Sequence, residues 1–252
     1  MGGAIVEGLI NGKRVEQGDI CVSDASRHAV ERFADSGVNI TTENHVAAMG
    51  GDIVMVVVKP WLVEQVLHQI KGVLDYDKQQ LVVVAAGIKS SQLKEWMLKD
   101  GQLPTMFLAI PNIAIAQGAS MTFLVEVTAG APQYAGQVKD LFDSMGQTIV
   151  TEEKLLAAGT TLASCGIAYA MRYIRAASEG GVELGFKADQ AKDIVLQTME
   201  GAVRLLQATG LHPEAAIDLV TTPGGVTIKG LNEMEHAGFT SAVIRGLKAG
   251  AK

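Results

Sequence analysis

The strongest constraint on the fold of this chain is a run of six apolar, mostly β-branched residues at positions 53–58 (IVMVVV). A strand without polar residues is typically buried on both faces, as in a parallel sheet covered by helices. A similar run occupies residues 81–84, and between the two the apolar residues of 62–70 recur at helical spacing. This alternation of strands and helices predicts βαβ units and a parallel sheet.

The same alternation continues through the first part of the chain and then stops. Further strands are expected at 20–23, 105–110, 121–127 and 148–150, and helices at 25–36, 91–98 and 132–145. Beyond these we expect only helices, at 157–184, 187–206, 213–219, 226–236 and 241–249. The sequence therefore predicts an α/β domain at 1–150 followed by an all-α domain at 151–252.

Composition excludes several classes of protein. The chain has 252 residues, of which 48% are hydrophobic and 19% are charged, so it can bury a core. This composition excludes disorder, a collagen helix and a coiled coil as descriptions of the whole chain. The net charge of −6 leaves no basic stripe, so we expect no nucleic-acid partner. No apolar run reaches the length of a membrane span, and the start lacks the basic segment of a signal peptide, so we expect no membrane association.

The spacing of the cysteines and histidines argues against a metal site and a disulfide framework. Cys21 and Cys165 are far apart, and neither belongs to a CxxC pair. The five histidines do not have the spacing of a zinc site, so we expect no metal. Free thiols fit a reducing compartment, and we expect a soluble cytoplasmic protein. The many small residues of 157–177 leave two interpretations open, namely tight packing within the chain or a helical interface between subunits.

The start of the chain carries a weak signal for dinucleotide binding. Residues 2–9 read as a helix, and Met1-Gly2 fit the last two positions of a G-x-G-x-x-G turn that a parallel α/β sheet places before such a helix. Asp24 lies directly behind a predicted strand, where a carboxylate can bind a ribose 2′-hydroxyl. Ser23, Ser26 and Arg27 could instead hold a 2′-phosphate. The simpler interpretation of Asp24 is the N-cap region of the next helix.

Three further turns follow predicted parallel strands, and ligands of such sheets bind at the carboxyl ends of the strands. Pro60 stops one strand, and Gly87 allows the backbone to approach a flat ring. Ordinary βα turns would explain these residues equally well. The turns consist of Val58-Lys59-Pro60, Ala85-Ala86-Gly87 and Pro111-Asn112.

The sharpest local signal is the segment 220–228 (VTTPGGVTI), in which a Pro-Gly-Gly turn leads into an amphipathic helix. Free N–H groups and the positive end of the helix dipole favour a carboxylate or phosphate there. Thr222 and Thr227 add two hydroxyls. The alternative is a helix–helix connection with a threonine cap. No Ser/His/Asp or Cys/His set stands out, so any demanding chemistry would belong to a cofactor.

Taken in order, these segments resemble the pyrroline-5-carboxylate reductase family. The most specific is 218–231 (DLVTTPGGVTIKGL), while the three turns above and 163–166 (ASCG) lie at the family's places. The resemblance implies a Rossmann-type N-terminal domain and a helical C-terminal domain that intertwines with a partner subunit in a homodimer or larger homo-oligomer. It implies reduction of 1-pyrroline-5-carboxylate to L-proline with NADPH or NADH, the last step of proline biosynthesis.

The resemblance also assigns roles to residues. Gly224, Gly225 and Val226 would donate N–H groups to the substrate carboxylate, and Thr227 would hydrogen-bond the ring nitrogen as the catalytic residue. Thr222 completes the implied substrate site. The implied cofactor site consists of Gly2, Ser23, Asp24, Arg27, Asn44, Val58, Lys59, Pro60, Ala85, Ala86, Gly87, Pro111 and Asn112, with Asn44 near the adenosine end.

The chain departs from the family pattern in three places. The first strand and the leading glycines of the dinucleotide turn are missing, so we expect that the natural start lies upstream and that Met1 is internal to the turn. Residues 113–115 (IAI) replace the usual Thr-Pro, and Ile167 replaces a proline. A β-hydroxyacid dehydrogenase relative is the main alternative, but its catalytic lysine has no counterpart between Leu155 and Phe186. The second alternative is a non-catalytic oligomeric relative that has lost its nucleotide site.

Overall fold

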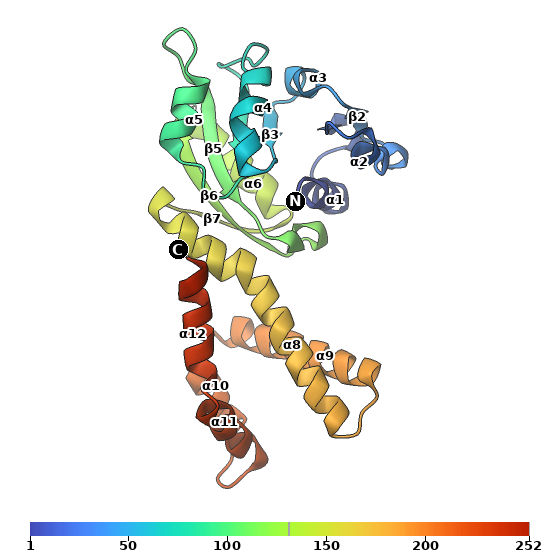
Figure 1. The fold of residues 1–252 in the computed structure, drawn as a ribbon, viewed down its shortest axis with the longest axis vertical. Coiled ribbons are helices and arrows are strands. Elements are labelled where there is room, and N and C mark those ends of the chain that lie inside the picture. The colour runs from blue at the N-terminus through green and yellow to red at the C-terminus, as the bar shows by residue number, and fades with distance from the viewer. Residues whose placement is uncertain (131, 252) are drawn as a thin grey trace. The chain divides into compact units, whose positions relative to one another are not determined.

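The computed structural model describes residues 1–130 and 132–251, which form two compact units (Figure 1). The first unit comprises Met1–Ser164, and the second begins at Cys165. In chain order, the first contains α1 (Gly2–Gly12), β1 (Cys21–Ser23), α2 (Arg27–Glu31), β2 (Asn39–Thr41), α3 (Asn44–Met49), β3 (Ile53–Val56), α4 (Val63–Ile70), β4 (Gln80–Val83), α5 (Ser90–Met97), β5 (Thr105–Ile110), β6 (Ser120–Thr128), α6 (Pro132–Asp143), β7 (Gly146–Val150) and α7 (Leu156–Gly159).

The main sheet of the first unit has five strands in the order β3-β4-β5-β6-β7. β3, β4 and β5 are parallel, as predicted, but β6 runs antiparallel to β5 and parallel to β7. The prediction of a parallel sheet is therefore wrong at β6. The cause is the short connection 111–119 between β5 and β6, because a parallel crossover needs about a dozen or more residues.

β1 and β2 form a separate two-stranded parallel sheet. β2 has no counterpart among the predicted strands, since three residues are too few to show a period. Within the described residues, no strand lies between this pair and β3. The pair is nevertheless tied to the main sheet, because Ile20 and Val38 belong to the same buried cluster as Val82 of β4.

Alternation along the strands produces two cores, one on each face of the main sheet (Figure 1). Val82 and Phe107 pack with α1 and α6, whereas their neighbours Val83 and Leu108 pack with α4 and α5. Successive side chains of a strand point to opposite faces, so both faces of these strands must be apolar. This double burial explains the unbroken apolar runs in the sequence.

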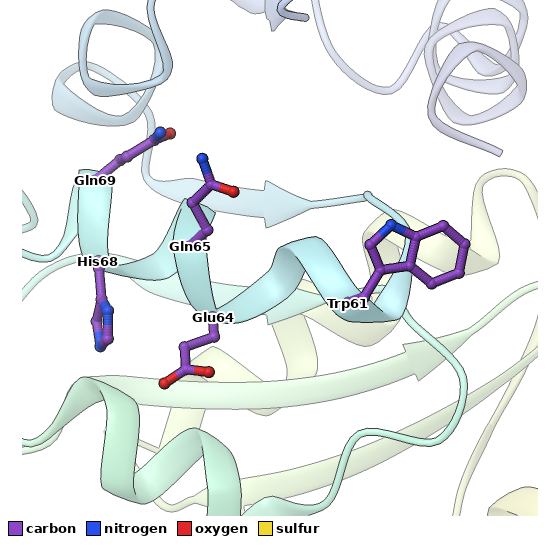
Figure 2. Close-up of a pocket in the computed structure, with 5 residues that line it drawn as sticks. All are labelled: Trp61, Glu64, Gln65, His68 and Gln69. Atoms are coloured by element: carbon purple, nitrogen blue, oxygen red, sulfur yellow. The ribbon is translucent and has the colours of Figure 1, made fainter.

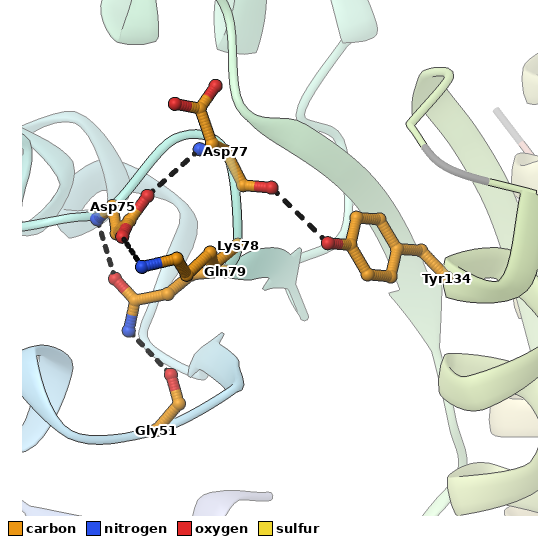
Figure 3. A network of polar contacts seen from close by, with 6 residues as sticks. All are labelled: Gly51, Asp75, Asp77, Lys78, Gln79 and Tyr134. Carbon is orange, nitrogen blue, oxygen red and sulfur yellow. Dashed lines mark hydrogen bonds and ion pairs between the residues drawn. The ribbon is translucent and has the colours of Figure 1, made fainter.

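Gln79 ties the segment before β4 to the end of α3, in the network shown in Figure 3. Its side chain is buried, and its Nε2 donates to the carbonyl oxygens of Ala48 (2.8 Å) and Gly51. Its Oε1 accepts from the backbone N–H of Asp75 (2.8 Å). At the rim of the network, the exposed hydroxyl of Tyr134 donates to the carbonyl of Asp77 (3.2 Å).

We expect Gln79→Ala to lower the free energy of unfolding by about 2–3 kcal/mol, because it leaves buried backbone groups without partners. Thermal or urea unfolding followed by circular dichroism measures the change. Tyr134→Phe is the matched control, since its hydrogen bond is exposed, and we expect a change below about 0.5 kcal/mol. Equal losses for the two variants would contradict a special role for Gln79.

The predicted helices 25–36 and 157–184 are both interrupted. The first consists of α2 and a separate 3₁₀ turn at Ala34–Ser36, after which Gly37 (φ 80°) ends the segment. The second contains a π-helical turn, Thr160–Cys165, between α7 and α8 (Gly166–Glu183). Within the first unit, Ser164 Oγ donates to the carbonyl of Pro111 (3.3 Å). Tertiary contacts of this kind hold the widened turn, and helical periodicity does not reveal them.

The predicted domain boundary at residue 150 coincides with the end of β7. The segment that follows still packs on the first unit: Leu156 contacts the cluster around α4 and α5. Gly159 lies against the ring of Phe123, with 2.9 Å between the ring and the position of an added Cβ. For this reason the compact unit extends to Ser164.

The second unit consists of α8, α9 (Ala188–Thr209), α10 (Pro213–Leu219), α11 (Val226–His236) and α12 (Phe239–Gly250). Among residues 165–251, Ala191 and Ala216 are the only buried apolar residues. Many large apolar side chains are exposed instead, among them Met171, Leu184, Phe186, Ile194, Leu196, Val203, Leu205 and Ile244. Exposed apolar surface on this scale marks an interaction surface. Over the described residues, no helix has both the length and the hydropathy needed to cross a bilayer.

Candidate functional site

The first unit brings most of the predicted cofactor residues to one edge of its sheets. The residues 58–60, 85–87 and 111–112 follow β3, β4 and β5, which are parallel neighbours, so their carboxyl ends share an edge. Ser23 ends β1 of the smaller sheet. In α/β sheets this edge is where ligands bind.

The adenosine end of the predicted site is organised by a chain of hydrogen bonds. Ser23 Oγ donates to Asn44 Oδ1 (2.9 Å), and Asn44 Nδ2 donates to Gln69 Oε1 (2.7 Å). These contacts join the end of β1, through the start of α3, to α4. Asp24 Oδ1 accepts from the backbone N–H of Ser26 (2.8 Å), as an Asx turn does, and Arg27 Nε pairs with Glu31 (2.9 Å).

The start of α1 fits a bound anion. α1 has no side-chain cap at its N-terminus and no acidic residue in its first turn, so its first N–H groups are available. Gly2 lies beside Val57, the residue directly after β3, with 3.8 Å between the position of an added Cβ and that side chain. At Gly3, an added Cβ would lie 2.3 Å from Nη2 of Arg32. Sequence reasoning missed Arg32, because only the fold brings this guanidinium to α1, where it pairs with Glu7 (2.6 Å).

The turns after β4 and β5 differ in character. Gly87 has a left-handed backbone (φ 80°), and an added Cβ would meet no atom within 4 Å, so the surface there is open to a flat ring. Asn112 is buried, and its side chain accepts from the N–H of Ala114 (3.0 Å) and donates to the carbonyl of Ala163 (3.5 Å). Asn112 thus holds the β5–β6 connection in place, and its contact with a cofactor stays a prediction.

Cys21 lies at the start of β1 and is exposed. It is a free thiol, and burial raises the pKa of this thiol above its ordinary value. The thiolate is the reactive form of cysteine, and a raised pKa disfavours that form. Within residues 1–130 and 132–251, no cluster of three or more His, Cys, Asp or Glu side chains could hold a metal ion.

The second unit carries the predicted anion site at the start of α11. Gly224 adopts a left-handed conformation (φ 71°), and an added Cβ on Gly225 would lie 2.4 Å from Thr222 Oγ1, so both positions favour glycine. α11 has no side-chain cap, and Val226 and Thr227 are exposed, which leaves their N–H groups free for a ligand. One expectation is corrected: the N–H of Gly225 donates to the carbonyl of Thr222 (2.9 Å) and closes the turn.

Two family models together cover the chain. Residues 1–153 match the NAD binding domain of 6-phosphogluconate dehydrogenase, and residues 153–252 match the pyrroline-5-carboxylate reductase dimerisation family. The expected architecture, a Rossmann-type α/β domain followed by a helical domain, is confirmed.

Relatives of known name agree with the family models. Pyrroline-5-carboxylate reductase 1 of Dictyostelium discoideum is 36% identical over 98% of this chain, which spans about half (46%) of that relative's length. Pyrroline-5-carboxylate reductase 2 of the same organism is 33% identical over 100% of this chain and 88% of its own. The pyrroline carboxylate reductase structure from Plasmodium falciparum, solved with NADP bound, has the same fold (TM-score 0.88, 23% identity, 99% of this chain and 91% of that one). This chain therefore belongs to the pyrroline-5-carboxylate reductase family.

Proposed function

We propose that the chain reduces 1-pyrroline-5-carboxylate to L-proline by hydride transfer from a reduced nicotinamide dinucleotide, as the last step of proline biosynthesis. The observation that carries the proposal is the capless, glycine-lined start of α11 in a chain that also holds a dinucleotide-type edge. Substrate and product both bear a carboxylate, and this helix start is suited to receive one. Family membership supports the same conclusion.

The substrate site is proposed to work through positioning. The N–H groups of Val226 and Thr227 hold the carboxylate, and Gly224 and Gly225 let it approach because neither has a side chain. Thr222 flanks the turn with a second hydroxyl. The Thr227 hydroxyl accepts a hydrogen bond from the protonated ring nitrogen, which favours the iminium form and orients C5. An iminium carbon accepts hydride without a strong acid, so orientation and electrostatics suffice.

The cofactor site is proposed to lie along the strand ends of the first unit. When bound, the dinucleotide would supply the hydride, with its pyrophosphate at Gly2 and its nicotinamide beside the turn 85–87, while Lys59 and Pro60 line the same edge. At the ribose, Asp24 suits a 2′-hydroxyl, whereas Ser23 and Arg27 suit a 2′-phosphate. We propose that the chain uses NADPH or NADH.

The second unit is proposed to form a homodimer or larger homo-oligomer through its helices. Its exposed apolar side chains support this, as does its match to a dimerisation family. We place the reaction in the cytoplasm, since Cys21 and Cys165 are both free thiols.

We expect NADPH or NADH oxidation, followed at about 340 nm, when pyrroline-5-carboxylate is added to the chain. The faster dinucleotide identifies the preferred one. Thr227→Ala is expected to lower kcat by about 10- to 100-fold, because it removes the hydrogen bond that orients the iminium. Its unfolding temperature should be unchanged, since the side chain is exposed. Unchanged kinetics in the variant would remove Thr227 from the site, and no oxidation by the unmodified chain would contradict the proposed function.

A further inference from the structure

An exposed tryptophan stands beside the predicted cofactor edge without an assigned role. Trp61 follows Lys59 and Pro60 at the carboxyl end of β3, and 76% of its surface is exposed. A large aromatic side chain this exposed is typical of a binding surface. It lines a hollow of about 580 Å³ whose other walls are Glu64, Gln65, His68 and Gln69 (Figure 2).

The hollow is continuous with the adenosine end of the site. Gln65 and Gln69 are four residues apart in α4 and so share one side of that helix, and Trp61 lies in the 3₁₀ turn Pro60–Leu62 directly before it. Figure 2 shows Gln65 and Gln69 pointing to the same side, while Glu64 and His68 point to the opposite side. Gln69 is hydrogen-bonded to Asn44, and Asn44 to Ser23 at the end of β1.

We propose that Trp61 is the stacking platform for the adenine ring of the dinucleotide, an inference that rests on the proposed function. An indole offers a flat apolar face of the size of a purine, and stacking of bases on aromatic side chains is strong without sequence-specific contacts. The Gln65 amide can both donate to and accept from the edge of adenine. Glu64 points to the opposite side of α4 from Gln65, so Gln65 and not Glu64 is the polar partner proposed for the adenine edge.

The chain offers a clean spectroscopic test, because it contains two tryptophans, Trp61 and Trp96. In Trp96→Phe, which leaves Trp61 as the single emitter, we expect titration with 5′-AMP to quench the fluorescence to a plateau. Nicotinamide mononucleotide, which lacks adenine, should leave the emission unchanged. In the matched variant Trp61→Phe, which leaves Trp96 as the emitter, neither probe should alter the fluorescence.

Affinity provides the second readout. Trp61→Ala is expected to raise the Kd for 5′-AMP and for NADP⁺ by about tenfold, the size of one lost base–aromatic contact. Trp61→Phe, which keeps an aromatic face, should restore most of the affinity. The proposal is overturned if 5′-AMP does not quench Trp61, if nicotinamide mononucleotide quenches instead, or if Trp61→Ala binds both ligands normally. These titrations contain no imine, so a chain that binds adenine but fails to reduce pyrroline-5-carboxylate would contradict the proposed function alone.

Discussion

Gly225→Val is expected to lower kcat/KM for pyrroline-5-carboxylate by at least about a hundredfold. An added Cβ would lie 2.4 Å from Thr222 Oγ1, and the branched side chain would obstruct the approach to the N–H groups of Val226 and Thr227. Each charge-assisted hydrogen bond to the carboxylate contributes about 1.5–3 kcal/mol, so the loss of two accounts for a factor of this size. Steady-state kinetics on the purified variant measure it.

Two controls make this result specific to the carboxylate. With 1-pyrroline, a cyclic imine that lacks the carboxylate, the variant and the unmodified chain should have the same kcat/KM. Gly136→Ala, in α6 of the first unit, is the matched glycine control, because an added Cβ there meets no atom within 4 Å. We expect this control to be fully active. An equal loss of Gly225→Val on both imines would show that the turn does not act as a carboxylate site.

Elements whose limits depend on local chemistry could be predicted from the sequence. The strand Thr105–Ile110 and the helices Pro213–Leu219 and Val226–His236 have the predicted bounds. In each case the signal lies in adjacent residues: an unbroken apolar run, a proline at the first helical position, or a glycine pair before the helix. The left-handed conformation of Gly224 has the same local origin.

Features that depend on contacts distant in sequence could not be predicted. The antiparallel direction of β6 follows from the short 111–119 connection, which reverses the direction of the chain. The π turn Thr160–Cys165 is held by contacts with Pro111 and Asn112. At the candidate site, Arg32 reaches Gly3 through the fold alone. Trp61 was recognisable in principle, because it directly follows the Lys59-Pro60 turn, but its exposure appears only in the structure.

In the second unit, α9 exposes apolar side chains on more than the side that packs within the chain. Ala191 is buried against Gly181 of α8, which accounts for one side of the helix. The helical angle of 100° per residue places two further apolar pairs on opposite sides, and all four side chains are exposed. The pairs are Ile194 with Leu205 and Leu196 with Val203. The charged side chains of α9, among them Asp193, Glu200 and Arg204, lie on the remaining side of the helix. We propose that a second copy covers the exposed apolar sides.

The double variant Leu196→Glu/Val203→Glu is therefore expected to convert the oligomer to monomers and to lose much of the helical signal of the second unit. Buried charges without partners would oppose association, and the monomer has almost no core among residues 165–251 to hold its helices. Sedimentation and circular dichroism measure the two effects, and the unmodified chain should show an unfolding temperature that rises with protein concentration. Leu98→Glu is the matched control, because Leu98 is a similarly exposed leucine of the first unit, and it should remain oligomeric. An oligomer unaffected by charges on this side of α9 would show that other helices form the interface.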